Sequence, residues 1–138
     1  MNQDLERIRV RDVMNQAVQW AEGGENLRAA ADRMAEHRIR ALLVRGRTDV
    51  DLPGILTSKD VVNLIGAHDV AVLDQLHVDD ACTRPAICVP DTTNLLDCIN
   101  LMRHAGVRRV PVLRGTEVVG VLSFSDVFTR LLQRGSGA

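Results

Sequence analysis

Apolar residues recur at helical spacing in two stretches of the chain that lie 68 positions apart. In each stretch they occupy positions i, i+3, i+4 and i+7, the spacing that gives a helix one buried face. The two sets are Leu27, Ala30, Ala31 and Met34, and then Leu95, Cys98, Ile99 and Met102. The pattern therefore predicts two amphipathic helices that are equivalent parts of a repeat.

Shorter apolar runs on either side of these helices are typical of β-strands. One strand is expected before each helix, around 17–21 and 86–89, followed by the turn residues Gly23-Gly24 and Pro90-Asp91-Thr92. After each helix come two more strands and a closing helix, at 41–44, 54–56 and 58–65 in the first copy and at 109–113, 118–122 and 124–132 in the second. Residues 114–117 are expected to join their strands as a hairpin turn. Each copy thus has the predicted order β-α-β-β-α.

The repeat extends to individual polar residues. Residues 9–44 align without a gap on 77–112, and the heptapeptide GILTSKD at 54–60 matches GVLSFSD at 120–126. The first copy has two extra residues between 45 and 53, where Gly, Asp and Pro indicate a loop. A search for repeats comes first because a missed repeat misassigns the fold.

One copy of this repeat is too small to be comfortably stable alone, because small domains bury little of their surface. We therefore expect a mixed α/β (α+β) fold in which two motifs pack with pseudo-twofold symmetry. The predicted organisation is a first motif at 8–66, a linker at 67–76, a second motif at 77–133 and a flexible tail at 134–138.

Composition narrows the function classes. A formal net charge of −1 argues against nucleic acid or an anionic membrane as a partner, and no apolar run is long enough to span a bilayer. Cys82, Cys88 and Cys98 are odd in number and lack C-x-x-C spacing, so they are interpreted as reduced packing residues of a cytosolic protein. The charged N-terminus does not resemble a signal peptide. With 2% aromatic residues there is no platform for stacking single-stranded nucleic acid.

The two heptapeptides carry the candidate chemistry. Thr57 with Asp60, and Ser123 with Asp126, stand where a strand gives way to a helix. One interpretation is pure helix capping, because a hydroxyl there accepts a backbone N–H and the aspartate suits the positive end of the helix dipole. The other is a ligand site, in which the carboxylate, the hydroxyl and the helix amides anchor polar groups.

Catalysis and metal binding are not predicted. No histidine accompanies either heptapeptide, so a serine nucleophile would lack its base. The four histidines do not have metal-ligand spacing, and the methionines Met14, Met34 and Met102 are interpreted as packing residues. Trp20 is the only tryptophan, and it is interpreted as a core residue or, alternatively, as a base-stacking residue.

The order of these elements, present twice, resembles the tandem CBS-domain pair, also called a Bateman module. The resemblance covers about residues 10–132 and rests on RVRDVM at 9–14, the weaker HVDDAC at 77–82, GVRRVPV at 106–112 and the two heptapeptides. The first copy departs from the pattern, since Leu43 stands where the second copy has Pro111.

The resemblance implies a set of ligand-contacting residues. In this family the heptapeptide aspartate commonly holds the ribose of an adenosine nucleotide, which points to Asp60 and Asp126. Arginines near the second strand often reach the phosphates, and an Arg fork suits phosphate oxygens. The implied phosphate contacts are Arg40, Arg108 and Arg109, and the implied adenine contacts are Val18, Ile39, Ala86, Ile87, Val107 and Pro111.

Two functions remain open from the sequence. The first is a non-catalytic regulatory module that binds AMP, ADP, ATP, NAD or S-adenosylmethionine in clefts between its two motifs. The second is a structural or dimerisation module with empty, degenerate clefts. The resemblance also implies a homodimer, for which the closing helices offer Val61, Leu64, Ile65, Val127, Leu131 and Leu132 as apolar surface. An effector protein is a further expected partner, and no cofactor other than the nucleotide is expected.

Overall fold

The computed structural model describes residues 2–136, with side chains for residues 4–133. The chain divides into two compact units. We call Gln19–Ala86 the central unit, and the described residues up to Val18 together with those from Ile87 onward the terminal unit. Each of the two units holds one three-stranded sheet in the described part of the chain.

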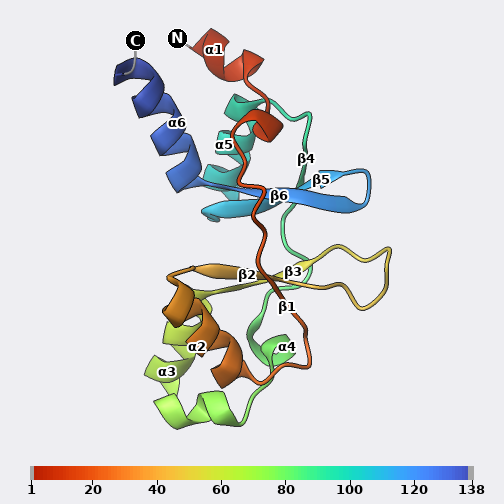
Figure 1. Cartoon of the computed structure of the whole chain (residues 1–138), viewed down its shortest axis with the longest axis vertical. Helices are drawn as coiled ribbons and strands as arrows, with labels where there is room; N and C mark the ends of the chain where they lie inside the picture. The colour runs from red at the N-terminus through yellow and green to blue at the C-terminus, as the bar shows by residue number, and fades with distance from the viewer. Residues whose placement is uncertain (1, 137–138) are drawn as a thin grey trace. The chain divides into compact units, whose positions relative to one another are not determined.

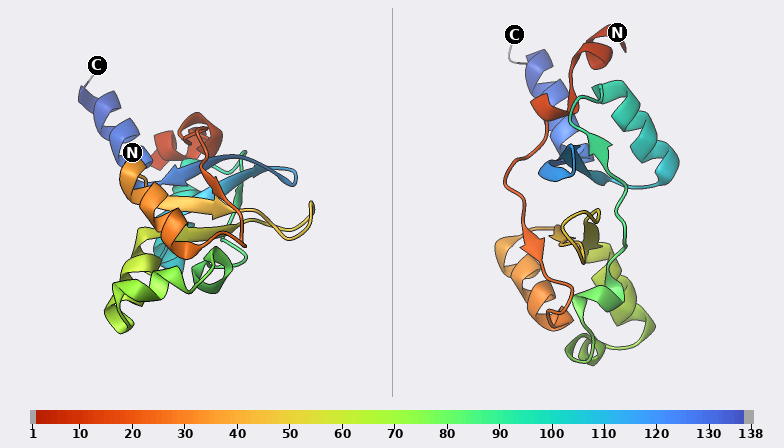
Figure 2. Two further views of the ribbon diagram at one scale, coloured as in Figure 1. Left: turned by 60° about the horizontal axis from the view of Figure 1, so that its bottom comes forward. Right: turned by 90° about the vertical axis from the view of Figure 1, so that its right-hand side faces the viewer.

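The central unit contains the elements that the first repeat predicts. Its sheet has the order β1-β2-β3, with β1 parallel and β3 antiparallel to β2. Helices α2 and α3 cover the same face of this sheet (Figures 1 and 2). The elements are β1 (Trp20–Ala21), α2 (Leu27–His37), β2 (Ala41–Val44), β3 (Gly54–Thr57), α3 (Ser58–Ala67), η2 (Val70–Asp74) and α4 (Val78–Ala81).

The terminal unit has the same plan. Its sheet has the order β4-β5-β6, again with a parallel and then an antiparallel pairing, and α5 and α6 lie on one face of it (Figures 1 and 2). Its elements are α1 (Asn2–Arg7), η1 (Val10–Asp12), β4 (Val89–Pro90), α5 (Leu95–Ala105), β5 (Arg109–Arg114), β6 (Glu117–Ser123) and α6 (Phe124–Ser136). None of the helices within residues 2–136 is long and apolar enough to cross a membrane.

The amphipathic helices form where the spacing predicts them, and both begin at an asparagine cap. The side chain of Asn26 accepts the Ala29 N–H at 3.1 Å, and that of Asn94 accepts the Asp97 N–H at 2.8 Å. Such caps satisfy backbone donors that have no partner within the helix. The buried faces of α2 and α5 include Leu27, Ala30 and Met34, and Leu95, Cys98 and Met102, as the pattern predicts.

The helix ends differ in residue type but not in backbone. Arg38 follows α2 with φ 55°, and Gly106 follows α5 with φ 71°, so both are left-handed. Glycine adopts this conformation without a steric penalty, whereas an arginine adopts it at a steric cost. The repeat therefore keeps the turn while losing the residue best suited to it.

The segment before each first strand packs on the helix of the other repeat. We call residues 8–18 and 76–86 the lead-in segments. The Leu95 N–H donates to the Ile8 carbonyl at 2.8 Å, and the equivalent Leu27 N–H donates to the Leu76 carbonyl at 2.8 Å. Val10 is fully buried in the core of the terminal unit, and the residue aligned with it, Val78, is fully buried in the core of the central unit.

Because each lead-in segment packs with the other repeat, the two compact units do not coincide with the predicted motifs at 8–66 and 77–133. Within each unit the lead-in segment pairs with the third strand of the sheet, Asn15 with Val121 and Thr83 with Ile55. The strands β1 and β4 begin later than the expected 17–21 and 86–89. The expected linker at 67–76 contains η2, whose Leu73 is buried.

The two hairpins differ in their connections. In the terminal unit Arg114 pairs with Glu117 across a short turn in which Gly115 has φ 64°, as predicted for 114–117. In the central unit a longer loop joins β2 to β3 (Figure 1). At the C-terminus α6 runs to Ser136, beyond the expected helix end at 132 and into the expected tail, of which 137–138 lie outside the described residues.

Candidate functional site

The first heptapeptide forms a strand-to-helix corner held by reciprocal hydrogen bonds. The Thr57 N–H donates to Asp60 Oδ2 at 2.8 Å, and the Asp60 N–H donates to Thr57 Oγ1 at 3.3 Å. The Thr57 hydroxyl also donates to Asp60 Oδ2, at 2.9 Å. We call this arrangement at the start of α3 the Asp60 corner.

The second heptapeptide forms the equivalent Asp126 corner at the start of α6. The Ser123 N–H donates to Asp126 Oδ2 at 3.0 Å, and the Asp126 N–H donates to Ser123 Oγ at 3.1 Å. The capping hydrogen bonds expected from the sequence are thus present at both corners. These bonds do not exclude ligand binding, because capping engages only one oxygen of each carboxylate.

The second oxygen, Oδ1, is the chemically relevant one. Neither Asp60 Oδ1 nor Asp126 Oδ1 accepts a hydrogen bond from any residue that the structure describes. Both aspartates are half-buried. An ionised carboxylate is an acceptor on both oxygens. Each corner therefore presents a fixed acceptor to any hydroxyl donor placed against the start of the helix.

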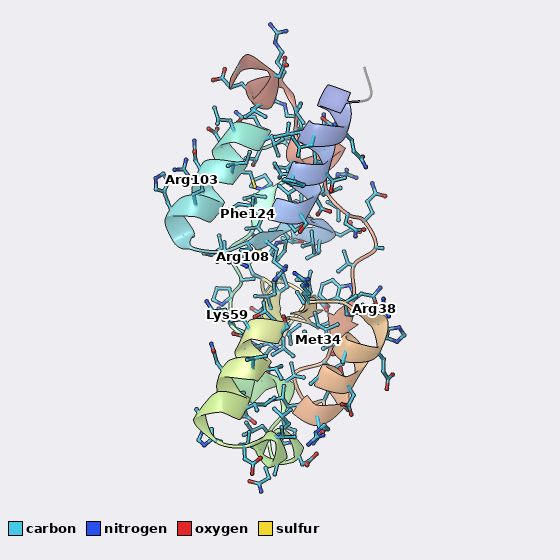
Figure 3. All side chains as sticks on the ribbon, turned by 90° about the vertical axis from the view of Figure 1, so that its left-hand side faces the viewer. Met34, Arg38, Lys59, Arg103, Arg108 and Phe124 are labelled. Carbon is cyan, nitrogen blue, oxygen red and sulfur yellow. The ribbon has the colours of Figure 1, made fainter. Side chains whose placement is uncertain are left out.

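An arginine is held next to each corner by its own backbone. The Ser58 N–H donates to the Arg40 carbonyl at 2.9 Å, and the Phe124 N–H donates to the Arg108 carbonyl at 2.9 Å. Both arginine side chains are exposed, and in Figure 3 Arg108 is labelled close to Phe124 at the start of α6. The two repeats thus place an arginine residue beside a helix N-terminus through the same backbone hydrogen bond.

Arg109 occupies a different position from Arg108. It lies in β5 opposite Ser123, is half-buried, and already has a partner within the chain. At the aligned place in the central unit, Ala41 lies opposite Thr57. The second cation that the sequence assigns to the Asp126 corner therefore comes from the strand and is not repeated in the first copy.

The residues expected to contact adenine divide between the units. Ile39 and Ala86 belong to the central unit with Asp60, whereas Val18, Ile87, Val107 and Pro111 belong to the terminal unit with Asp126. Because the lead-in segments pack with the other repeat, Ala86 of the second repeat lies in the unit of the Asp60 corner. Val18 of the first repeat lies in the unit of the Asp126 corner.

Their burial is uneven. Ile87 is 42% exposed, Ala86 is 5% exposed and Pro111 is fully buried, while the remaining three are half-buried. Ile39 and Val107 also pack against the cores of their own units. The adenine assignment therefore stays a prediction.

Trp20 is not among the buried residues of either core, so it is not the core residue expected, and the base-stacking interpretation stays a prediction. The Arg45 guanidinium lies 4.6 Å from the centroid of its ring, and Arg45 also pairs with Glu22 at 2.8 Å. The ring is half-buried. A cation over an aromatic face is electrostatically favourable, so Trp20 serves here as a partner for Arg45.

Sequence reasoning missed an open hollow of about 470 Å³ beside the β2–β3 loop. The two extra residues of this loop were the available signal. Arg84, which lines the hollow, is held by Asp79 at 2.7 Å and by the Arg45 carbonyl at 2.9 Å. The hollow is lined by Arg47, Val50, Asp51, Leu52, Arg84 and Pro85.

The cysteines are packing residues by their environment, as predicted. None is part of a disulfide. Burial raises the pKa of Cys88 and of Cys98 to about 11, and it also raises the pKa of Cys82. Thiols with such values are poor nucleophiles near neutral pH.

Among the described residues no group of three or more histidine, cysteine, aspartate or glutamate side chains could hold a metal ion. The histidines His37, His68, His77 and His104 are all exposed.

The chain belongs to the CBS-domain family. The family model of the CBS domain matches it twice, over residues 10–67 and 78–133. Proteins of this family are generally regulatory rather than catalytic. The match confirms the resemblance to a tandem CBS pair and the mixed helix-and-strand fold class.

Individual relatives agree with this assignment. Hypoxic response protein 1 of Mycobacterium tuberculosis is 32% identical over 131 residues, which cover 88% of this chain and 83% of the relative. A hexameric CBS-CP12 protein from bloom-forming cyanobacteria superposes with a TM-score of 0.82 at 25% identity, covering 93% of this chain and 73% of that one.

The CBS domain of a bacterial CNNM/CorC family Mg²⁺ transporter, solved in complex with ATP, has a TM-score of 0.78 at 22% identity. The match covers 94% of this chain and 91% of that one. At this identity the match shows the fold alone.

Proposed function

We propose that the protein is a non-catalytic regulatory module that binds an adenosine-containing ligand at the Asp60 and Asp126 corners. The observation that carries the proposal is the repeated geometry of these corners. In both, one carboxylate oxygen caps the helix, the other has no partner among the described residues, and an exposed arginine adjoins the helix N-terminus. A ribose hydroxyl suits the oxygen and a phosphate suits the arginine and the amides.

The candidate ligands are AMP, ADP, ATP, NAD and S-adenosylmethionine. A CBS domain of the same fold is solved in complex with ATP, which supports an adenine nucleotide as the first ligand to test. In this proposal Arg40, Arg108 and Arg109 contact the phosphates. The residues that contact the adenine are Val18, Ile39, Ala86, Ile87, Val107 and Pro111. A regulatory effect requires that the ligand prefer one conformation of the protein over another.

The decisive experiment separates ligand binding from capping. In Asp126→Asn, the amide oxygen can keep accepting the Ser123 N–H while the amide nitrogen replaces the acceptor Oδ1 with a donor. We expect binding at that corner to weaken at least about tenfold, since hydrogen bonds to charged groups are worth about 1.5–3 kcal/mol. The free energy of unfolding should change by less than about 1 kcal/mol. Calorimetric titration and urea denaturation measure the two quantities, and Asp60→Asn repeats the test at the other corner.

A matched control lies on α5. Asp97 occupies the same third helical position after its own cap residue, Asn94, but adjoins neither corner in the sequence. Asp97→Asn should leave nucleotide binding unchanged. If the wild-type protein binds none of the five ligands, the regulatory proposal fails and the structural module with empty sites replaces it.

The proposal includes a homodimer and a cytoplasmic location. Val61 and Val127, two residues expected at the dimer surface, lie in the cores of their units instead. The exposed apolar side chains of α6 are Phe124, Phe128 and Leu132, spaced by four residues and so on one helix face. The three thiols outside any disulfide suit a reducing compartment.

The role of the exposed apolar face of α6, formed by Phe124, Phe128 and Leu132, in dimerisation can be tested directly. Phe128 is 66% exposed, so replacing it should cost little stability in a single chain. We expect Phe128→Ser to convert a dimer into a monomer in light scattering coupled to size exclusion. Val50→Ser, which alters an apolar residue that is 78% exposed in the β2–β3 loop, away from both closing helices, is the control. An unchanged mass for Phe128→Ser would remove α6 from the interface.

A further inference from the structure

The Asp60 and Asp126 corners differ at the residue immediately before the aspartate. The first heptapeptide has Lys59 there, and the second has Ser125. The corners share a hydroxyl cap, the aspartate and the backbone bond to the preceding arginine. The substitution therefore changes the charge of the corner without changing its backbone.

Lys59 is well placed to act on a bound anion. It is the second residue of α3, its side chain is exposed, and no ion pair or hydrogen bond to another described residue engages its ammonium group. Figure 3 shows it at the first turn of the helix. Arg40 adjoins the same turn, because its carbonyl accepts the N–H of Ser58, the residue before Lys59.

The cations of the two corners are therefore arranged differently. The Asp60 corner has one cation from the helix, Lys59, and one from the residue before β2, Arg40. The Asp126 corner takes both of its cations from the strand side, and one of them, Arg109, is half-buried and already partnered. Ser125 can donate one hydrogen bond but carries no charge.

We propose that Lys59 makes the Asp60 corner selective for nucleoside polyphosphates, whereas the Asp126 corner discriminates less between ATP and AMP. The inference rests on the proposed function, since it names the ligand class of one of its two sites. With the ribose held at Asp60, each further phosphate adds negative charge for the ammonium group to attract. A lysine is a compact charge on a flexible four-carbon stem and can follow a phosphate chain of variable position.

The test isolates each corner and compares the ratio of ATP affinity to AMP affinity. Asp126→Asn leaves the Asp60 corner to bind, and Asp60→Asn leaves the Asp126 corner. We expect the higher ratio in the Asp126→Asn protein. Adding Lys59→Ser to it should lower the ratio about fivefold, the effect of losing one exposed ion pair. Adding Ser125→Lys to the Asp60→Asn protein should raise the ratio by a similar factor.

Three controls make the result specific. Lys59→Arg keeps the charge and should keep most of the ratio. Arg47→Ser removes an equal charge from the β2–β3 loop, at the other end of the hairpin from Thr57, and should leave the ratio unchanged. Higher salt should shrink the effect of Lys59→Ser on the ratio, because exposed charges are screened. Circular dichroism verifies that each variant is folded.

The failures of the two proposals are distinguishable. If the wild-type protein binds no adenine nucleotide, both the function and the selectivity are wrong. If the wild type binds nucleotides but the two corners have equal ratios, or the Asp60 corner binds nothing, only the selectivity is wrong. The selectivity is also overturned if Lys59→Ser leaves the ratio unchanged or if Arg47→Ser lowers it equally.

Discussion

The two repeats build the same corner with different hydroxyl residues, and this changes how much of each carboxylate is left for a ligand. At the Asp60 corner Thr57 gives both its N–H and its hydroxyl proton to Oδ2. At the Asp126 corner Oδ2 accepts only the Ser123 N–H among the described donors. A carboxylate has about four acceptor directions, so Asp126 keeps one more of them than Asp60. Matching heptapeptides therefore do not imply equal binding sites.

The units also stabilise their first turns with differently placed charges. In the central unit the carboxylate of Asp79, held by Arg84, lies directly against Gly23, where a side chain would clash. In the terminal unit the residue aligned with Gly23 is Asp91. This residue is buried, at 6% exposure, and its side chain pairs with Arg114 at 3.0 Å. Each turn has a carboxylate and an arginine, but from different segments. The repeat keeps the interaction and not the residue.

The largest effect is expected from substitutions in the two hydrophobic cores, which test whether the two units are equally stabilised by packing. Leu27 and Leu95 align and are both fully buried. We expect Leu27→Ala and Leu95→Ala each to lower the free energy of unfolding by about 3 kcal/mol, because each leaves a cavity in a packed core. Urea denaturation measures the loss, and Val50→Ala, at a residue 78% exposed, is the control with little effect. A loss below about 1 kcal/mol at one leucine would show that the cores are not equivalent.

A smaller effect is expected where the helix ends differ. Arg38→Gly should stabilise the protein by about 0.5–1 kcal/mol, because glycine enters the left-handed conformation without strain. Gly106→Arg should destabilise it by about 1 kcal/mol for the same reason. Thermal unfolding of both variants measures the pair. If Arg38→Gly is destabilising instead, the Arg38 side chain contributes more than its backbone costs.

Much of this structure follows from local sequence patterns. The helical spacing of Leu27 and Leu95 predicts α2 and α5, since a helix with one apolar face must bury it. Ser123 and Asp126 predict a capped helix start, because those atoms reach their backbone partners within four residues. The turn at 114–117 is likewise local. Such interactions depend on neighbours in the sequence, so the sequence contains them in full.

Other features depend on residues that meet only in the folded chain. The cation over Trp20 comes from Arg45, which follows β2, and no spacing rule pairs them. The Thr57 hydroxyl could donate to either carboxylate oxygen of Asp60, and in the folded chain it donates to Oδ2, which leaves Oδ1 for a ligand. The unequal burial of Ile87 and Pro111 is also a property of the packing, so the adenine contacts could be named only through the family resemblance.

By itself the sequence determined the repeat, the order of its elements, the capped corners and the family. Only the tertiary structure decided that each lead-in segment packs on the other repeat's helix. Val10 and Val78 are aligned, equally apolar and equally buried, and their neighbours make the same backbone hydrogen bonds. A repeat offers each segment two chemically similar partners, so local pattern cannot choose between them. The choice is made by the packing of the whole chain, which joins residues from both repeats in each unit.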